Sequence, residues 1–181
     1  MTTPAYPADV LERAARIKLI GFDVDGTMTD GRLHYGTGER DGKTFYVQDG
    51  MGLTLLRHAG IRLALVTARQ SPVVAARGSE LKIDHVHIGE RGKLACMQRI
   101  AAGMGIGMDA VAFMGDDLPD LAALRAAGLA IVPANAHPWA RAAAHWVTPR
   151  PGGEGAARDT CDLLLHAQGR VEAILAHGEH P

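Results

Sequence analysis

Carboxylate, hydroxyl and ammonium side chains follow the ends of several apolar runs in this sequence. They belong to Asp23, Asp25, Thr67, Lys93, Asp116, Asp117 and Asp120. Several carboxylates cannot lie close together unless a cation or a proton relieves their repulsion. An oxygen ligand set without histidine or cysteine favours Mg²⁺. The sequence therefore predicts a magnesium site.

A magnesium ion beside a carboxylate suits phosphoryl transfer, because the metal offsets the phosphate charge and holds it next to a nucleophile. The reaction needs mainly positioning and charge stabilisation, which Thr67, Lys93 and the turn amides after Asp23 can provide. A second carboxyl must protonate the leaving alkoxide and later activate water. Asp25 follows closely enough after Asp23 to reach the opposite side of the phosphoryl group.

Apolar runs that alternate with helical patterns must position these residues. Strands are predicted over 18–24, 61–66, 85–88, 110–114, 129–132 and 145–147. Helices are predicted over 7–16, 49–58, 71–81, 93–102, 119–126, 138–143 and 157–176. Asp49 is expected to cap the second helix, as Ser71 with Pro72 caps the third. The pattern predicts an α/β fold: a Rossmann-like parallel sheet with helices on both faces and ligands beyond the carboxyl ends of its strands.

Two segments interrupt this alternation. The ranges 32–35 and 43–47 flank a turn-rich stretch, which predicts a β-hairpin insertion at about 31–48, after the first strand. A glycine- and proline-rich C-terminal tail covers about 149–159. There is no room for a large cap domain, so we expect residues 1–181 to form a single hydrolase domain.

Bulk composition narrows the possible functions. A chain with 47% hydrophobic and 22% charged residues is typical of a soluble globular protein. The formal net charge of -1 shows no basic excess that would suggest nucleic acid. The two cysteines, Cys96 and Cys161, form no CxxC motif and suit a reducing cytoplasm. Without a signal-peptide or membrane-span pattern, the expected location is cytoplasmic, with no membrane partner.

The motifs DVDGT, VTAR, the isolated Lys93 and GDDLPD together resemble the four motifs of the haloacid dehalogenase-like hydrolase superfamily. Longer stretches, among them TDGRLHYGTGE, FYVQDGMGLTLL and PGGEGAARDTCDLLL, resemble the 3-deoxy-D-manno-octulosonate 8-phosphate phosphatases. This second similarity extends over about residues 17–170. It implies a Mg²⁺-dependent phosphatase that acts on a small sugar-acid phosphate in lipopolysaccharide biosynthesis.

The resemblance also implies a role for each position of the motifs. Asp23 would be the nucleophile, with its other oxygen on the metal. Asp25 would be the acid/base, with its backbone carbonyl on the metal, and Asp116 would be the third protein ligand. Thr67 and Lys93 would hold the phosphate.

Residues around this centre are expected to support it. Asp117 and Asp120 would orient Lys93 or metal-bound water. Arg69 and Arg158 are candidates for binding a substrate carboxylate or phosphate. The resemblance implies a homotetramer in which hairpins near residues 32–47 pack together. The tail is then expected to reach an active site, that of a neighbouring subunit, as a lid.

Other functions remain open at this point. A phospho-accepting receiver domain also combines aspartates, a hydroxyl and a lysine, but it accepts phosphate after its third strand. A non-catalytic oligomeric scaffold is disfavoured because all four motifs are present. Among phosphatases, a nine-carbon keto-sugar acid 9-phosphate is the alternative substrate. The chain departs from the family pattern at Thr27, Ala68, Gln48 and Gly92, and the last two bear on substrate contacts or on the support of Lys93.

Overall fold

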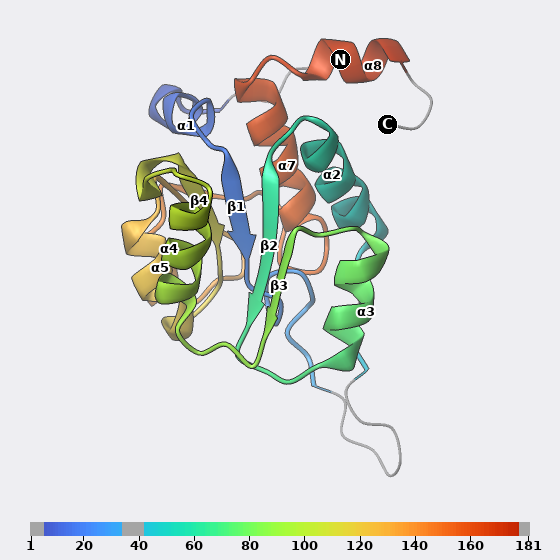
Figure 1. Ribbon diagram of the computed structural model, residues 1–181, viewed down its shortest axis with the longest axis vertical. Helices are drawn as coiled ribbons and strands as arrows, with labels where there is room; N and C mark the ends of the chain where they lie inside the picture. The colour runs from blue at the N-terminus through green and yellow to red at the C-terminus, as the bar shows by residue number, and fades with distance from the viewer. Residues whose placement is uncertain (1–5, 34–41, 178–181) are drawn as a thin grey trace.

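The computed structural model describes residues 6–33 and 42–177 (Figure 1). Its strands are β1 (Leu19–Phe22), β2 (Arg62–Thr67), β3 (His85–Ile88), β4 (Val111–Met114), β5 (Leu129–Val132) and β6 (Trp146–Val147). They form one six-stranded sheet in the order β3-β2-β1-β4-β5-β6, and neighbouring strands pair in parallel. Because β1 lies at the centre, the loop that follows it opens between the ends of β2 and β4.

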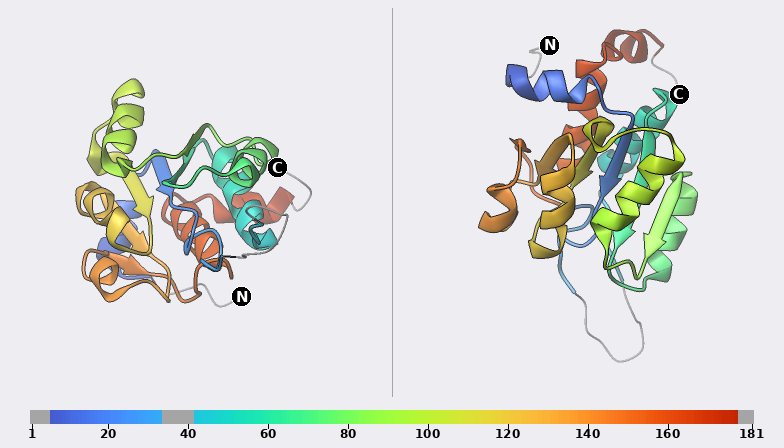
Figure 2. Two further views of the ribbon diagram at one scale, coloured as in Figure 1. Left: turned by 90° about the horizontal axis from the view of Figure 1, so that it is seen from below. Right: turned by 60° about the vertical axis from the view of Figure 1, so that its left-hand side comes forward.

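Helices cover both faces of the sheet. They are α1 (Ala8–Ala14), α2 (Val47–His58), α3 (Pro72–Glu80), α4 (Lys93–Gly103), α5 (Leu121–Ala126), α6 (Pro138–Arg141), α7 (Ala156–Ala167) and α8 (Val171–His177), with 3₁₀ turns η1 (Met108–Ala110) and η2 (Leu118–Asp120). One face is covered by α1, α2, α3 and α7, and the other by α4, α5 and α6, as Figures 1 and 2 show. None of the described helices is long and apolar enough to span a membrane.

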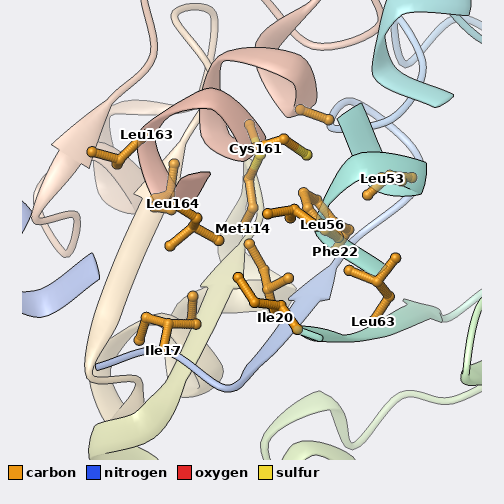
Figure 3. Close-up of a cluster of buried hydrophobic side chains, with 14 of the residues drawn as sticks. Ile17, Ile20, Phe22, Leu53, Leu56, Leu63, Met114, Cys161, Leu163 and Leu164 are labelled. Atoms are coloured by element: carbon orange, nitrogen blue, oxygen red, sulfur yellow. The ribbon is translucent and has the colours of Figure 1, made fainter. Parts of the chain in front are cut away.

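The core beneath α2 and α7 is built from large apolar side chains of the central strands. Ile20 and Phe22 of β1 lie beside Met114 of β4 and face Leu56 of α2 and Leu164 of α7 (Figure 3). Each fully buried side chain of this kind contributes roughly 1.5–3 kcal/mol to folding. Since both faces of these strands are buried, they read in the sequence as continuous apolar runs rather than as alternating patterns.

The structure confirms the predicted α/β sheet with helices on both faces. The long helix expected over 157–176 is in fact two helices, because Gly169 between them has a φ of +64°, which an α-helix cannot contain. Asp49 is not the cap of α2, which begins earlier, at Val47. Asp49 instead lies fully buried in the first turn of that helix.

The predicted β-hairpin falls largely on residues 34–41, which lie outside the described residues. The described flank at 42–46 is irregular, so the strand predicted over 43–47 is wrong. In that flank Lys43 and Phe45 are partly buried, whereas the residues on either side of them are exposed. The sequence alternation was therefore real, but it belongs to an extended segment packed on the domain without a strand partner among the described residues.

Candidate active site

The loop after β1 is held in a tight turn at the carboxyl edge of the sheet. Asp23 continues the pairing of β1 with β4, since its N–H donates to the Met114 carbonyl at 2.9 Å. The Val24 carbonyl then accepts the N–H groups of Met28 and Thr29, which folds the chain back on itself. Gly26 has a φ of +90°, and a Cβ there would lie 2.2 Å from the Asp116 carboxylate. Only glycine lets the two loops approach this closely.

Three carboxylates converge where β1 and β4 end. One oxygen each of Asp23, Asp116 and Asp120 lies within 4.8 Å of the others. Burial, and next the charge of Asp120, raise the pKa of Asp23 to about 8, although Lys93 opposes the shift. Burial and Asp120 likewise raise the pKa of Asp116 to about 6. A divalent cation would relieve this repulsion, and the all-oxygen donor set fits Mg²⁺.

Asp120 is the least available of the three carboxylates for a metal. Its Oδ1 lies 2.6 Å from the Lys93 ammonium. Its Oδ2 accepts the backbone N–H groups of Asp116 at 3.0 Å and Asp117 at 3.2 Å. A Cβ on Gly115 would collide with this side chain, so glycine makes room for it. Because both of its oxygens already have partners, Asp120 is less available to a metal ion than Asp23 and Asp116.

Lys93 brings a buried positive charge to this cluster. It is the first residue of α4, after the short loop that follows β3, and its side chain is only 3% exposed. The ammonium lies 2.6 Å from Asp23 as well as from Asp120. Burial by itself would lower the pKa of Lys93, but the two carboxylates outweigh it and raise that pKa. The lysine therefore stays charged beside Asp23, where an anionic group can be bound.

Asp117 has a different structural role from Asp120, which belongs to the same GDDLPD motif. It is the N-cap of η2, and its Oδ1 accepts the N–H of Leu118 at 2.7 Å. Its side chain is about half exposed, and the imidazole of His137 lies 3.9 Å away. Of the two residues expected to orient Lys93, the structure thus brings Asp120 to the lysine and uses Asp117 to cap the turn.

Thr67 and Arg69 enter the site from the end of β2. The pairing of β2 with β1 aligns Leu65 with Phe22, so Thr67 lies beside the residues that follow β1. Thr67 is buried, and its hydroxyl accepts the N–H of Arg69 at 3.2 Å. The Arg69 Nε lies 3.7 Å from an oxygen of Asp25. The structure therefore brings both residues to the edge where Asp23 and Asp25 lie.

Sequence reasoning missed Lys43 at this site. Its ammonium forms an ion pair with Oδ1 of Asp25, and the lysine side chain is only 3% exposed. The available signal was the alternation that puts Lys43 on the same side of the chain as the partly buried Phe45. That pattern indicated an inward-facing lysine, although it could not indicate which carboxylate the lysine would meet.

The glycine-rich segment lies against the β1 loop of its own chain. The N–H of Gly153 donates to the Thr27 carbonyl at 3.2 Å, and that of Gly152 donates to the Asn135 side chain at 2.9 Å. A Cβ on Gly152 would lie 1.8 Å from the Gly26 carbonyl oxygen, so any larger residue would push the loop away. These contacts make the segment a support of the β1 loop of its own chain, and its role as a lid over an active site stays a prediction.

Arg158, the other residue expected to meet substrate, lies in the first turn of the helix that follows. Its guanidinium Nε lies 2.7 Å from Asp162, four residues further along α7. Its backbone N–H donates to Asp49. These contacts give Arg158 a structural place at the start of α7, and binding of a substrate group by it stays a prediction.

The sequence of this chain is similar to those of known phosphatases. A family model of haloacid dehalogenase-like hydrolases matches residues 89–158. The 3-deoxy-D-manno-octulosonate 8-phosphate phosphatase of Yersinia pestis is 38% identical over 164 residues, which are 91% of this chain and 88% of that protein. The phosphatase of the same name from Escherichia coli strain K12 is 37% identical over 165 residues, with the same coverage.

Solved structures of proteins with similar sequences have the same fold. A hypothetical protein from Xanthomonas campestris superposes with a TM-score of 0.94 at 49% identity, covering 98% of this chain and 100% of that one. The 3-deoxy-D-manno-octulosonate 8-phosphate phosphatase of Moraxella catarrhalis, solved with a magnesium ion, a phosphate ion and a KDO molecule, has a TM-score of 0.93 at 39% identity. That match covers 96% of this chain and 100% of that one.

Proposed function

The chain belongs to the 3-deoxy-D-manno-octulosonate 8-phosphate phosphatase family of the haloacid dehalogenase-like hydrolases, and we propose that it hydrolyses this sugar-acid phosphate with Mg²⁺. One observation carries the proposal: Lys93 lies 2.6 Å from Asp23, beside a crowded carboxylate cluster that fits a divalent cation. A nucleophile, a cation for the phosphate and metal ligands thus share one edge of the sheet. A relative solved with magnesium, phosphate and KDO supports the assignment.

Different residues of the chain would bind the metal, attack phosphorus and bind the phosphoryl oxygens. Asp23, Asp116 and the backbone carbonyl of Asp25 would hold Mg²⁺, which offsets the charge of the phosphate when bound. An oxygen of Asp23 attacks phosphorus and forms an aspartyl-phosphate as the ester P–O bond breaks. The ammonium of Lys93 and the hydroxyl of Thr67 bind the phosphoryl oxygens and stabilise the charge that develops on them.

Asp25 acts as the general acid in the first step and as the general base in the second. Its carboxyl gives a proton to the sugar oxygen as that oxygen leaves. The resulting carboxylate then takes a proton from water, and the water attacks the aspartyl-phosphate. This second step releases inorganic phosphate and restores Asp23. The two steps together need only substrate and water.

A phosphate-release assay tests the proposal directly. The purified protein should release phosphate from 3-deoxy-D-manno-octulosonate 8-phosphate with Mg²⁺, and lose this activity with a chelator until Mg²⁺ is restored. Asp23→Asn should lower kcat by more than about 10³-fold while the protein stays folded, because the amide cannot form the intermediate. Substantial Mg²⁺-dependent turnover by that variant would refute the assignment of the nucleophile.

The identity of the sugar is tested in the same assay. A nine-carbon keto-sugar acid 9-phosphate is the alternative substrate, and comparison of kcat/KM for the two compounds decides between them. Arg69, whose half-exposed side chain lies 3.7 Å from Asp25, is a candidate for recognising the sugar acid. Gln48 and Gly92 are the departures from the family pattern that bear most on this choice.

We further propose a homotetramer in the cytoplasm, assembled through the insertion at about 31–48. The described residues within it and just after it expose large apolar side chains, namely Leu33 (39%), Tyr46 (37%), Val47 (81%) and Met51 (44%). Exposed large apolar side chains that gather into a patch are typical of a protein–protein contact. Val47→Lys should dissociate the assembly in light scattering, whereas Leu175→Lys, at an exposed site on α8, should not. A fully active wild-type monomer would contradict the proposal.

A further inference from the structure

Asp25 lies between two cations that contact different oxygens of its carboxyl group. The Lys43 ammonium forms an ion pair with Oδ1, and the Arg69 Nε lies 3.7 Å from Oδ2. The Lys43 side chain is 3% exposed, whereas that of Arg69 is 50% exposed. Because water screens exposed charges far more than buried ones, the contact with Lys43 is the stronger of the two.

Packing on the C-terminal side of Lys43 holds its backbone in place. Phe45 is packed against the apolar core, and the guanidinium of Arg77 stacks over its ring at 5.7 Å. Further along, Asp49 is buried and accepts the N–H of Arg158. The segment that carries Lys43 is therefore anchored to the domain within a few residues. This ammonium does not reach Asp25 by chance from a long loose side chain.

We propose that Lys43 is a positioning residue for the acid/base step: it holds one oxygen of Asp25 so that the other faces the leaving group. The inference rests on the proposed function, because it needs Asp25 to exchange protons with the ester oxygen and with water. Lys43 itself transfers no proton. Its ammonium stays on Oδ1 through both steps, while Oδ2 gives up or takes the proton. The insertion thereby takes part in catalysis within its own chain.

This role makes a prediction that separates positioning from folding or substrate recognition. General acid catalysis matters most when the leaving group is poor. Phenyl phosphate and 4-nitrophenyl phosphate have similar shapes and lack the sugar, but phenolate is a much poorer leaving group than 4-nitrophenolate. The value of kcat/KM reports only the steps up to the first bond cleavage. Loss of Asp25 positioning should therefore lower kcat/KM selectively for phenyl phosphate.

The experiment compares Lys43→Gln with wild type on both esters at saturating Mg²⁺. We expect kcat/KM to fall about 10- to 100-fold for phenyl phosphate and less than about 3-fold for 4-nitrophenyl phosphate. Lys43→Arg, which keeps the charge, should recover most of the ratio between the two esters, and it keeps the test usable if the glutamine variant is unstable. Lys18→Gln, at an exposed site before β1, is the matched control and should leave the ratio unchanged.

A double-mutant comparison completes the test. In an Asp25→Asn background, Lys43→Gln should not change the ratio further, because the carboxyl on which it acts is absent. Equal losses on both esters in the single variant, no loss on either, or a further change in the Asp25→Asn background would each overturn the inference. If the wild-type protein cleaves neither ester nor any sugar phosphate, the failure lies in the proposed function instead.

Discussion

The carboxylate of Asp49 in α2 accepts a 2.7 Å hydrogen bond from the backbone N–H of Arg158, in the first turn of α7. The N-cap residue of α7 is Gly155, which has no side chain to cap the helix. Asp49 therefore caps α7 from a neighbouring helix and links the end of the insertion to the glycine-rich segment. Burial raises the pKa of this carboxyl to about 6, although the N–H of Arg158 partly opposes the shift.

The raised pKa of Asp49 predicts a pH-dependent effect on stability. Between its unfolded value of 3.8 and about 6, the folded state binds more protons at this site than the unfolded state. The contribution of Asp49 to the free energy of unfolding should thus fall as pH rises through this window, by at most about 1.4 kcal/mol per unit. Urea unfolding of wild type and Asp49→Asn at several pH values measures this contribution as their difference.

Asp84 provides a control, because its pKa is shifted in the opposite direction from that of Asp49. Its burial alone would raise the pKa, but hydrogen bonds from the Leu63 N–H and Arg62 outweigh burial and lower it. The difference between wild type and Asp84→Asn should therefore shrink as pH falls. A stability difference at Asp49 that grows with rising pH would contradict the raised pKa, because it would mean that the N–H of Arg158 outweighs burial.

Replacing Gly152 should disturb the β1 loop from a distance along the chain. In Gly152→Ala the new Cβ would lie 1.8 Å from the Gly26 carbonyl oxygen, so backbone must move. We expect a loss of about 1–3 kcal/mol in stability and a lower kcat, because the moved loop carries Asp23 and Asp25. Thermal unfolding and turnover measure the two effects. Gly103→Ala, where a Cβ would meet nothing within 4 Å, should be close to neutral.

Asp120 and Asp117 should differ sharply in their effect on phosphate binding. Asp120→Asn removes a carboxylate from Lys93 and disturbs the acceptor for two backbone N–H groups. We expect kcat to fall by about 10- to 100-fold and inorganic phosphate to inhibit less strongly. Asp117→Asn should change both by less than about 3-fold, because asparagine also caps a helical turn. Similar losses in the two variants would contradict the division of roles.

Magnesium binding should release protons. Burial, and next the charge of Asp120, raise the pKa of Asp23 to about 8 and of Asp116 to about 6, so the metal-free site is partly protonated near neutral pH. The ion binds carboxylates, and its apparent affinity should therefore increase from about pH 5 to pH 8 and level off above. Calorimetry in buffers of different ionisation enthalpy measures the released protons. An affinity that does not change over this range would contradict the raised pKa values of Asp23 and Asp116 in the metal-free site.

Much of the fold and part of the site could be predicted from local sequence patterns. The apolar run before Asp23 and that before Asp116 are continuous because both faces of the central strands are buried. Once these runs are recognised as parallel strands, the polar residues after each must meet at one edge of the sheet. This reasoning needs only neighbouring residues, and it brought Thr67 and Lys93 to the same edge.

Contacts between distant segments required the tertiary structure. Nothing near Lys43 in the sequence indicates that it pairs with Asp25, and Asp49 lies 109 residues from Arg158, whose N–H it accepts. Local patterns show which side of a segment faces inward, but the partner depends on how α2, α7 and the loops pack together. The sequence by itself determined the strands and the charged residues at their ends, because periodicity and turn chemistry are local. Only the tertiary structure decided which cation holds which carboxylate, because that depends on packing between segments far apart in the chain.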